Sequence, residues 1–303
     1  MKSGLFVGLI TLDFLYLATE FPSSNQKIVA ADYTVAAGGP ATNAAVTFNY
    51  LGNLEKSLKK PAQVCGVLGA SPLAGIIRAE LMQQGIEIID LLPESDTVPP
   101  ISSVIITQRT GNIATQRQGD RAVISLNAIR TQAGVENLTP EILANILENI
   151  GIVLIDGHQL EVGMAIAQLA KSLGIPTVLD GGSWKPGLEK ILPYIDYAIC
   201  SSNFYPPECT QQSEVIDYLL KQQIKHLAIT RGAASIIYVT NQQTGSIKIP
   251  QTPVIDTLGA GDIYHGAFCY YFLDKLDFVV ALTAAVEIAR KSCGSFGTRS
   301  WLK

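Results

Sequence analysis

The stretch DTLGAGDIYHGAF, residues 256–268, decides how the rest of the sequence is interpreted. Three residues with little or no side chain, Gly259, Ala260 and Gly261, stand between two aspartates, and an apolar run follows. This pattern predicts a tight turn at the start of a helix, where the first backbone N–H groups lack partners and the helix dipole favours an anion. Without bulky side chains an anion can approach those amides closely, so the turn is suited to a phosphate.

Asp262 directly follows this turn, and its carboxylate would repel a bound phosphate. The position makes chemical sense if the carboxylate takes a proton from a hydroxyl group that attacks the phosphate. The structural alternative is an ordinary acidic residue in the first turn of a helix, where Asp is common. The stretch is not a Walker A loop, because that motif needs Gly-Lys-Ser/Thr after the glycines.

The composition describes a folded chain with a large core. Of its 303 residues 48% are hydrophobic and 16% are charged. The formal net charge of -4 gives no reason to expect a nucleic acid or a membrane as partner. The five cysteines form no metal-binding pair and no disulfide framework, so we expect reduced thiols and a cytoplasmic protein. No apolar stretch approaches the roughly 20 residues that span a bilayer.

Apolar runs of strand character alternate with segments of helical period along the chain. Continuous apolar strands between helices predict a buried, mostly parallel sheet with helices on both faces. We expect strands near residues 4–10, 62–69, 151–157, 175–182, 197–201 and 226–230, and helices near 40–52, 72–85, 160–174, 212–223, 261–273 and 277–293.

Two segments rich in Thr, Gln and Ser interrupt this alternation, at about residues 14–36 and 99–119. Both read as exposed strands. They either meet in space as a small second sheet, a lid over the main domain, or form two unrelated surface hairpins. Because no linker, repeat or low-complexity tract divides the sequence, we treat residues 1–303 as one domain with this insertion.

The string D-T-x-G-A-G-D with its following helix resembles the C-terminal signature of the ribokinase-like (PfkB) carbohydrate kinases. The segment AAGGPATNAAVTFNYLG, residues 36–52, resembles the N-terminal signature of that family, and residues 229–238 and 284–298 are similar to its later segments. IDGHQLE and VLDGGSWKPG look closer to ketohexokinase-like members. The resemblance spans most of the chain. It implies a ribokinase-like three-layer α/β/α domain with a mostly parallel central sheet and a small β-sheet lid.

The resemblance also implies an activity, the ATP-dependent phosphorylation of a hydroxyl group of a small sugar such as ribose, fructose or a related ketose. Asp262 would be the catalytic base, and the amides of Gly259, Ala260 and Gly261 would stabilise the charge on the transferring phosphoryl group. In the same way Gly266 would let the helix pack closely against a neighbour. Further residues carried over from the family motifs are Asp13, Gly38, Gly39 and Asn43 for the sugar, and Thr230, Gly232, Asn203 and Gly297 for the nucleotide.

Two of the sugar-binding candidates have a structural alternative. An Asn side chain offers both a donor and an acceptor, which suits a vicinal diol, but Asn43 also fits an early helix residue that satisfies local backbone. Asp13 would end the first core strand, and it equally fits a turn residue at a strand end. Asp156 and His158 either line the sugar pocket or end a strand, whereas Asp256 is expected to order the glycine loop.

The expected cofactors are ATP and Mg²⁺, with a monovalent cation such as K⁺, and family likeness adds a homodimer formed through the lid. One departure concerns the metal. Many relatives carry N-x-x-E, whose Glu organises Mg²⁺ through water. Here Asn203 is followed by Pro206, and Glu208 is out of register, so the metal ligands stay unassigned.

Two other functions are compatible with the same sequence: a nucleoside kinase of the same fold, and a catalytically inactive sugar-binding sensor. The intact D-T-x-G-A-G-D favours an enzyme, whereas the missing N-x-x-E leaves the inactive sensor as an alternative. The sequence does not name the acceptor. Polar lid residues are the candidates that would select it, namely Thr107, Gln108, Gln116 and Gln118.

Overall fold

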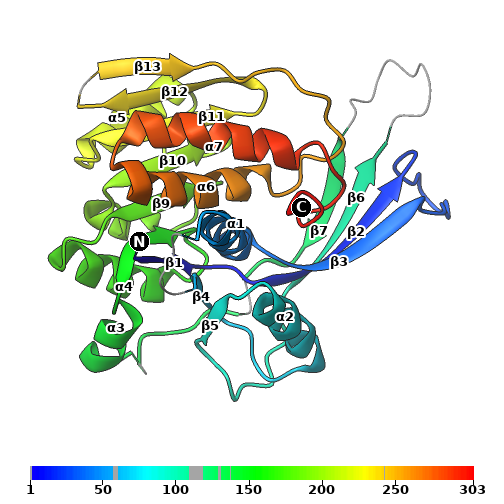
Figure 1. Ribbon diagram of the computed structural model, residues 1–303, viewed down its shortest axis with the longest axis horizontal. Helices are drawn as coiled ribbons and strands as arrows, with labels where there is room; N and C mark the ends of the chain where they lie inside the picture. The colour runs from blue at the N-terminus through cyan, green and yellow to red at the C-terminus, as the bar shows by residue number, and fades with distance from the viewer. Residues whose placement is uncertain (1, 57–60, 109–118, 129–130, 137, 242) are drawn as a thin grey trace.

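The apolar strands form one large twisted sheet at the centre of the molecule (Figure 1). The computed structural model describes residues 2–56, 61–108, 119–128, 131–136, 138–241 and 243–303. The sheet has nine strands in the order β13-β12-β11-β10-β9-β8-β1-β4-β5, and only β12 and β13 run antiparallel to their neighbours. The strands are β1 (Ser3–Val7), β4 (Gln63–Gly66), β5 (Glu87–Asp90), β8 (Ile150–Ile155), β9 (Thr177–Gly181), β10 (Tyr197–Ser201), β11 (His226–Arg231), β12 (Ala234–Thr240) and β13 (Gln243–Ile247).

Helices cover both faces of this sheet because successive side chains of a strand point to opposite sides. In β8, Ile152 and Leu154 join one hydrophobic core, while Val153 and Ile155 join the other. The first core contains α1 (Pro40–Leu54), α2 (Pro72–Gln83), α6 (Ala260–Lys275) and α7 (Phe278–Ser292). The second contains α3 (Pro140–Ile146), α4 (Leu160–Ser172) and α5 (Gln212–Lys221), with the short turns η1 (Leu188–Lys190) and η2 (Leu192–Tyr194). The predicted three-layer α/β/α arrangement is therefore confirmed (Figure 1).

The two inserted segments do meet, and they form a separate four-stranded sheet, the lid, in the order β3-β2-β6-β7. Its strands are β2 (Thr11–Ala18), β3 (Asp32–Gly38), β6 (Ile101–Thr107) and β7 (Arg121–Ser125). Strand β7 begins just beyond the expected boundary at 119, and residues 109–118 of that prediction, with Gln116 and Gln118, lie outside the described residues. The lid projects from one end of the main sheet (Figure 1).

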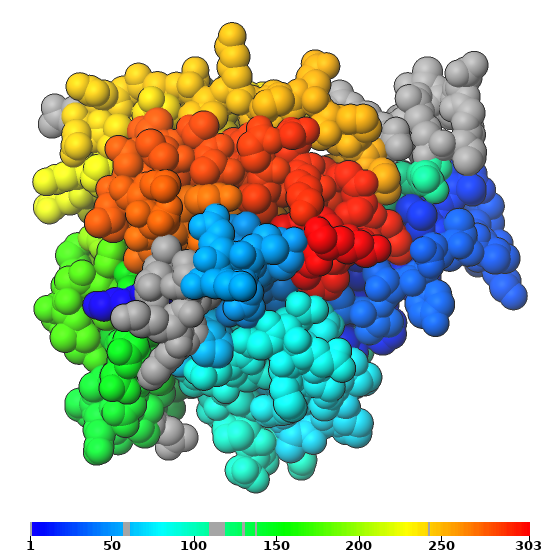
Figure 2. All heavy atoms as spheres, in the orientation of Figure 1, coloured from blue at the N-terminus to red at the C-terminus, as the bar shows by residue number. Residues whose placement is uncertain are grey.

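The inner face of the lid rests on the C-terminal part of the chain. Leu15 and Leu17 of β2 and Val104 and Ile106 of β6 are buried there, and Leu258 and Phe296 pack against them. Figure 2 shows the C-terminal segment in red, between the blue lid strands, the orange-red helices and the cyan region of α2. The lid is thus joined to the main domain by side chains from the far end of the sequence.

The expectation that Asp13 ends the first core strand is wrong. Strand β1 stops at Val7, the chain crosses to the lid, and Asp13 is the third residue of β2. The cause is the Asp156 carboxylate, since a Cβ on Gly8 would lie 1.9 Å from Asp156 Oδ1, and the Leu9 N–H donates to Asp156 Oδ2 at 2.8 Å. This side chain takes the place of a strand partner, so pairing between β1 and β8 ends there.

Helix α1 packs closely against α6, and this contact depends on a glycine. A Cβ on Gly266 would lie only 2.2 Å from the backbone oxygen of Ala44. No side chain fits at that distance, which confirms the packing role expected for Gly266. The contact fixes the start of α6 relative to the start of α1.

Candidate active site

The glycine turn lies at the N-terminus of α6. Gly259 precedes the helix with φ of 69°, in the left-handed region that favours glycine. A Cβ at this position would also approach Thr298 Cγ2 to 3.0 Å and Asn43 Nδ2 to 3.4 Å. Conformation and space therefore both require glycine at 259.

Free backbone donors border open space at this turn. The N–H of Ala260 donates to the Thr257 oxygen at 3.3 Å, whereas the N–H of Gly261 has no acceptor in the described part of the chain. A Cβ on Gly261 would meet nothing within 4 Å. An anion can therefore reach the start of the helix beside Gly261, as the sequence pattern predicts.

Asp256 orders the loop before the turn, in agreement with its expected role. Its Oδ1 accepts from the Leu258 N–H at 2.7 Å, and its Oδ2 accepts from the Gly297 N–H at 2.9 Å. One carboxylate thus joins the glycine turn to the C-terminal loop, and it is buried and unavailable for chemistry.

Asp262, the third residue of α6, is half-buried, and its Oδ2 accepts a hydrogen bond of 2.8 Å from Asn43 Nδ2. Loss of water around the carboxyl and the nearby carboxylate of Asp180 raise the pKa of Asp262 from 3.8 to about 7, against the opposing effects of the Asn43 hydrogen bond and His265. A carboxyl group with this pKa exchanges its proton near neutral pH, which is the property needed in a general base.

Asp180 and His265 form a buried pair beside Asp262. His265 Nδ1 lies 3.5 Å from Asp180 Oδ2, and this oxygen has no hydrogen-bond partner among the described residues. The same ring contacts the Gly261 oxygen at 2.7 Å and the Ile199 oxygen at 3.0 Å. His265 therefore ties the first turn of α6 to strand β10, while Asp180 acts on Asp262 through its charge.

The candidate sugar-binding residues lie at the junction of the lid and α1. Asp13 is 6% exposed, its Oδ1 accepts from Thr11 Oγ1 at 2.6 Å, and burial raises the pKa of its carboxyl. A Cβ on Gly38 would overlap Asp13 Oδ2 at 1.9 Å. Gly39, with φ of 93°, begins α1, where a Cβ would lie 2.2 Å from the Leu9 oxygen. The structure thus brings Asp13, Gly38, Gly39 and Asn43 to one place.

Arg299 and Glu80 complete this cluster, and no pattern in the sequence predicts either of them. Arg299 Nε donates to Glu80 Oε1 at 2.9 Å, and its Nη1 donates to Asn43 Oδ1, also at 2.9 Å. Its Nη2 donates to the backbone oxygen of Ala37, and Glu80 Oε2 accepts from the Ala37 N–H at 2.6 Å. Both residues face the candidate site although neither belongs to a recognisable motif.

Three of the four candidate nucleotide-binding residues lie close together, because Ser201 pairs with Thr230 and the Ser202 N–H donates to the Thr230 oxygen at 2.9 Å. Thr230 is half-buried near the carboxyl end of β11, Gly232 lies in the turn to β12 with φ of 60°, and Asn203 is exposed just after β10. All three are at the carboxyl edge of the parallel strands, where ligands bind in open α/β sheets. Gly297 is different, because a Cβ there would meet Thr34 Cγ2 of the lid at 3.0 Å.

Asp156 and His158, the two polar residues that were candidates for the sugar pocket, stabilise the fold. Asp156 accepts from the backbone N–H groups of Leu9 and His158, each at 2.8 Å, and the imidazole Nδ1 of His158 lies 3.1 Å from the same carboxylate. His158 and the other charges around Asp156 hold the pKa of its carboxyl below the usual range although burial acts in the opposite direction. The pair ends strand β8 and anchors residue 9.

The residues present do not match the metal arrangement of the family. Asn203 is exposed, Pro206 stands where the Glu is expected, and Glu208 is exposed. The described residues contain no cluster of three or more His, Cys, Asp or Glu side chains able to hold a metal ion. The described residues therefore offer no metal site of their own.

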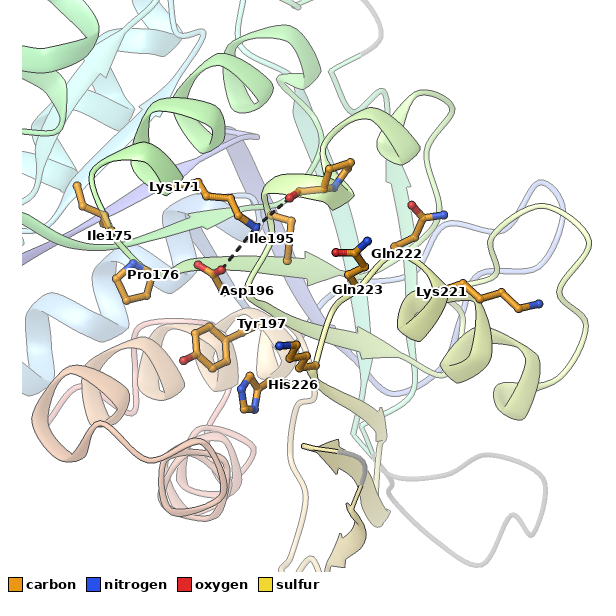
Figure 3. Close-up of a pocket in the computed structure, with 13 residues that line it drawn as sticks. Lys171, Ile175, Pro176, Ile195, Asp196, Tyr197, Lys221, Gln222, Gln223 and His226 are labelled. Atoms are coloured by element: carbon orange, nitrogen blue, oxygen red, sulfur yellow. Dashed lines mark hydrogen bonds and ion pairs between the residues drawn. The ribbon is translucent and has the colours of Figure 1, made fainter.

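A separate cavity of about 730 Å³ opens at the opposite, amino edge of the sheet (Figure 3). Lys171 there donates to the Pro193 oxygen at 2.9 Å and lies 3.9 Å from the Asp196 carboxylate. His226 lines the same cavity and contacts Thr240 Oγ1 at 2.7 Å. Because parallel strands run away from this edge, the cavity plays no part in a site built around Asp262.

The fold and this arrangement define a class of protein. A parallel sheet with a small lid, an anion-accepting glycine turn and a carboxyl group of near-neutral pKa together describe a phosphoryl-transfer enzyme with a small-molecule acceptor. The whole chain, residues 1–303, matches the model of the pfkB family carbohydrate kinases, and the protein belongs to that family.

Individual relatives agree with this assignment. A ribokinase of Lactococcus lactis is 22% identical over 300 residues, covering 97% of this chain and 91% of that protein. An adenosine kinase of Schizophyllum commune is 22% identical over 303 residues, covering 90% and 83%. The structure of Arabidopsis thaliana ribokinase complexed with ribose and ATP superposes with a TM-score of 0.73 at 20% identity, covering 100% of this chain and 99% of that one.

The protein is therefore a kinase of the sugar and nucleoside kinase family, and ATP with Mg²⁺ follows as the expected cosubstrate of such an enzyme. In the described residues no helix combines the length and the apolar character needed to cross a membrane.

Proposed function

We propose that this enzyme phosphorylates a hydroxyl group of a small sugar, with Asp262 as the general base. The observation that carries this proposal is that the Asp262 carboxyl, one residue after the free N–H of Gly261, accepts a hydrogen bond from the Asn43 amide. The Gly261 N–H is suited to a phosphate, and the Asn43 amide is suited to a sugar hydroxyl. A γ-phosphate and a hydroxyl bound at these two groups would both lie near the base.

In the reaction, the sugar hydroxyl is bound by Asp13 and Asn43, and Asp262 accepts its proton as the oxygen attacks the γ-phosphorus in line. The amides at the start of α6 donate to the phosphoryl oxygens as negative charge develops on them. Mg²⁺ bound to the phosphates of ATP would offset part of their charge, and no residue is assigned to hold it. Closure of the lid excludes water, which would otherwise compete as the acceptor.

Thr230, Gly232, Asn203 and Gly297 belong to the proposal as nucleotide-binding residues, the first three because they border the carboxyl edge of the sheet. K⁺ is included as an activating monovalent cation on the strength of family likeness alone. Replacing KCl by a tetramethylammonium salt at equal ionic strength would lower the turnover number if a specific cation activates the enzyme, and would leave it unchanged otherwise.

A homodimer formed through the lid is also part of the proposal. Residues paired across the lid strands place Tyr16, Tyr33, Val35 and Ile124 on the outer face, with exposed fractions of 40%, 70%, 37% and 78%. No described segment of the chain covers these side chains. Contiguous apolar surface of this kind is typical of protein interfaces, and a second copy of the lid would bury it.

A nucleoside kinase is the second candidate, because the family includes an adenosine kinase among the relatives of this chain. The lid residue paired with Asp13 is Ser102, whose small polar side chain favours a sugar over a stacked base. A panel of sugars and nucleosides with MgATP, assayed by release of ADP, separates the two candidates and also excludes a non-catalytic sensor if turnover depends on the acceptor.

The role of Asp262 is tested by Asp262→Asn. We expect kcat to fall by roughly 10² to 10⁴, the usual contribution of general-base catalysis, while nucleotide binding stays close to that of the wild type. Turnover near the wild-type rate would remove Asp262 from the mechanism.

A further inference from the structure

Arg299 occupies a position from which it controls the candidate base without contacting it. Its side chain comes from the C-terminal turn and is 17% exposed. It reaches three separate elements: Glu80 on α2, Asn43 on α1 and Ala37 on β3. In Figure 2 the red C-terminal segment lies against the cyan and blue parts of the chain that carry these partners.

The contact with Asn43 fixes the orientation of its amide. A carboxamide has one acceptor end and one donor end, and exchanging them reverses both. The guanidinium donates to Oδ1 of Asn43, so the amide nitrogen must face Asp262, where it donates at 2.8 Å. Without Arg299, only the Asp262 carboxylate itself would favour this orientation, and a protonated Asp262 would not.

Glu80 holds the guanidinium in place and at the same time caps an edge strand. Ala37 belongs to β3, which lies at the edge of the lid sheet, where backbone groups lack a strand partner. Glu80 accepts from the Ala37 N–H, and Arg299 donates to the Ala37 oxygen. The ion pair thus replaces a neighbouring strand directly before the Gly38–Gly39 turn of the sugar side.

We propose that Arg299, held by Glu80, is a positioning residue that orients the Asn43 amide toward Asp262 and anchors the end of β3 beside the sugar. This inference rests on the proposed role of Asp262 as the base. Arg299 acts through Asn43 and touches neither substrate, so its loss should lower kcat and alter the protonation of the base.

Several charges act on Asp262, and together they determine in which direction its pKa should change when Arg299 is removed. Asp180 of β9 and Asp13 of β2 disfavour its ionised form, while the Asn43 hydrogen bond and His265 of α6 favour it. When Arg299 is removed, the oxygen end of the Asn43 amide loses its donor, the amide is held by Asp262 alone, and its hydrogen bond to the carboxylate is weakened. The carboxyl then becomes harder to ionise, and the acid limb of the kcat/KM profile moves to higher pH.

The test compares Arg299→Met, Arg299→Ala and Glu80→Gln with the control Arg290→Met, an arginine on α7 that pairs with Glu287 on the surface. For Arg299→Met we expect a loss of about 10²-fold in kcat, as for a misplacement of reacting groups by about 1 Å, and an unchanged KM for ATP. The midpoint on the acid side of the kcat/KM profile should shift upward by about one pH unit, the equivalent of one hydrogen bond to a charged group. Glu80→Gln should give a smaller change in the same direction, and the control none.

Guanidinium chloride at non-denaturing concentration should restore part of the kcat of Arg299→Ala and leave Arg290→Met unaffected. Wild-type kcat in Arg299→Met, or a lowered kcat with neither a shifted acid limb nor rescue, would overturn the inference. These outcomes differ from failure of the proposed function, in which Asp262→Asn itself would remain active.

Discussion

Asn43 and Asp262 are joined by a hydrogen bond of 2.8 Å although 219 positions separate them in the sequence. The bond connects the first turn of α1 with the first turn of α6, and the contact at Gly266 sets the distance between these two helices. The geometry of the candidate base is therefore a property of helix packing as much as of the local glycine turn.

The first prediction concerns the pH dependence of catalysis. Because the pKa of Asp262 is raised to about 7, the fraction of enzyme with an ionised base falls as the pH drops below that value. We expect kcat/KM for the sugar to decrease tenfold per pH unit on the acid side of a midpoint near pH 7. Initial rates at fixed MgATP would measure it, and a profile that stays flat well below this midpoint would contradict the assignment.

The second prediction isolates the role of Asp180, whose carboxylate disfavours the ionised form of Asp262. Asp180→Asn removes that like charge, so Asp262 should ionise more readily and the acid limb should shift to lower pH. The same rate measurements on the variant provide the test. A shift to higher pH, or none, would mean that desolvation alone raises the pKa of the base.

The third prediction concerns sugar binding by Asp13. Asp13→Asn should raise the KM for the sugar by about 10- to 100-fold, the equivalent of one hydrogen bond to a charged group, with the Kd for ATP unchanged. Asp32→Asn is the matched control, because Asp32 is an exposed residue of β3 that accepts only from the Tyr33 N–H in the described contacts. Equal effects of the two substitutions on the KM would argue against a sugar subsite at Asp13.

The fourth prediction compares two helical glycines. Gly266→Ala places a Cβ 2.2 Å from the Ala44 oxygen, so we expect a loss of about 1–3 kcal/mol in the free energy of unfolding. A Cβ on Gly75 of α2 would meet nothing within 4 Å, and Gly75→Ala should instead gain about 0.5–1 kcal/mol from helix propensity. Urea unfolding monitored by circular dichroism measures both, and effects of the same sign would disprove the packing argument.

The fifth prediction concerns the outer face of the lid. If a second copy covers it, the double substitution Tyr33→Lys and Ile124→Lys should convert a dimer to a monomer in sedimentation velocity experiments. Leu173→Lys is the control, since Leu173 is an exposed apolar residue at the end of α4, far from the lid sheet. A wild-type protein that sediments as a monomer throughout the accessible concentration range would contradict the predicted dimer.

Sequence reasoning predicted the features that depend on local pattern. The alternation of strands and helices predicted the layered sheet, and the glycines near 260 predicted an anion-accepting helix start, because periodicity and small side chains are visible in a few consecutive residues. The pattern left open whether the two polar insertions meet, whereas the family resemblance implied that they form a lid sheet, and the pairing of β2 with β6 shows that they meet.

What could not be predicted depends on contacts between distant segments. Asp13 was placed in the wrong strand because the break after β1 is caused by the side chain of Asp156, far along the chain. Arg299 and Glu80 belong to no motif, and only the folded chain brings them to Asn43. The helix α3 was also missed, since its seven residues are too few to show a clear period.

The hydrogen bond between Arg299 and Asn43 at the start of α1 has a consequence for biosynthesis. The lid and α1 are synthesised well before Phe296 and Arg299, the side chains that support them. A nascent chain that extends only to Asp262 therefore carries the candidate base but lacks the Arg299 contacts with Asn43 and Glu80. With the positioning role proposed for Arg299, a ribosome-bound chain of that length should show little kinase activity.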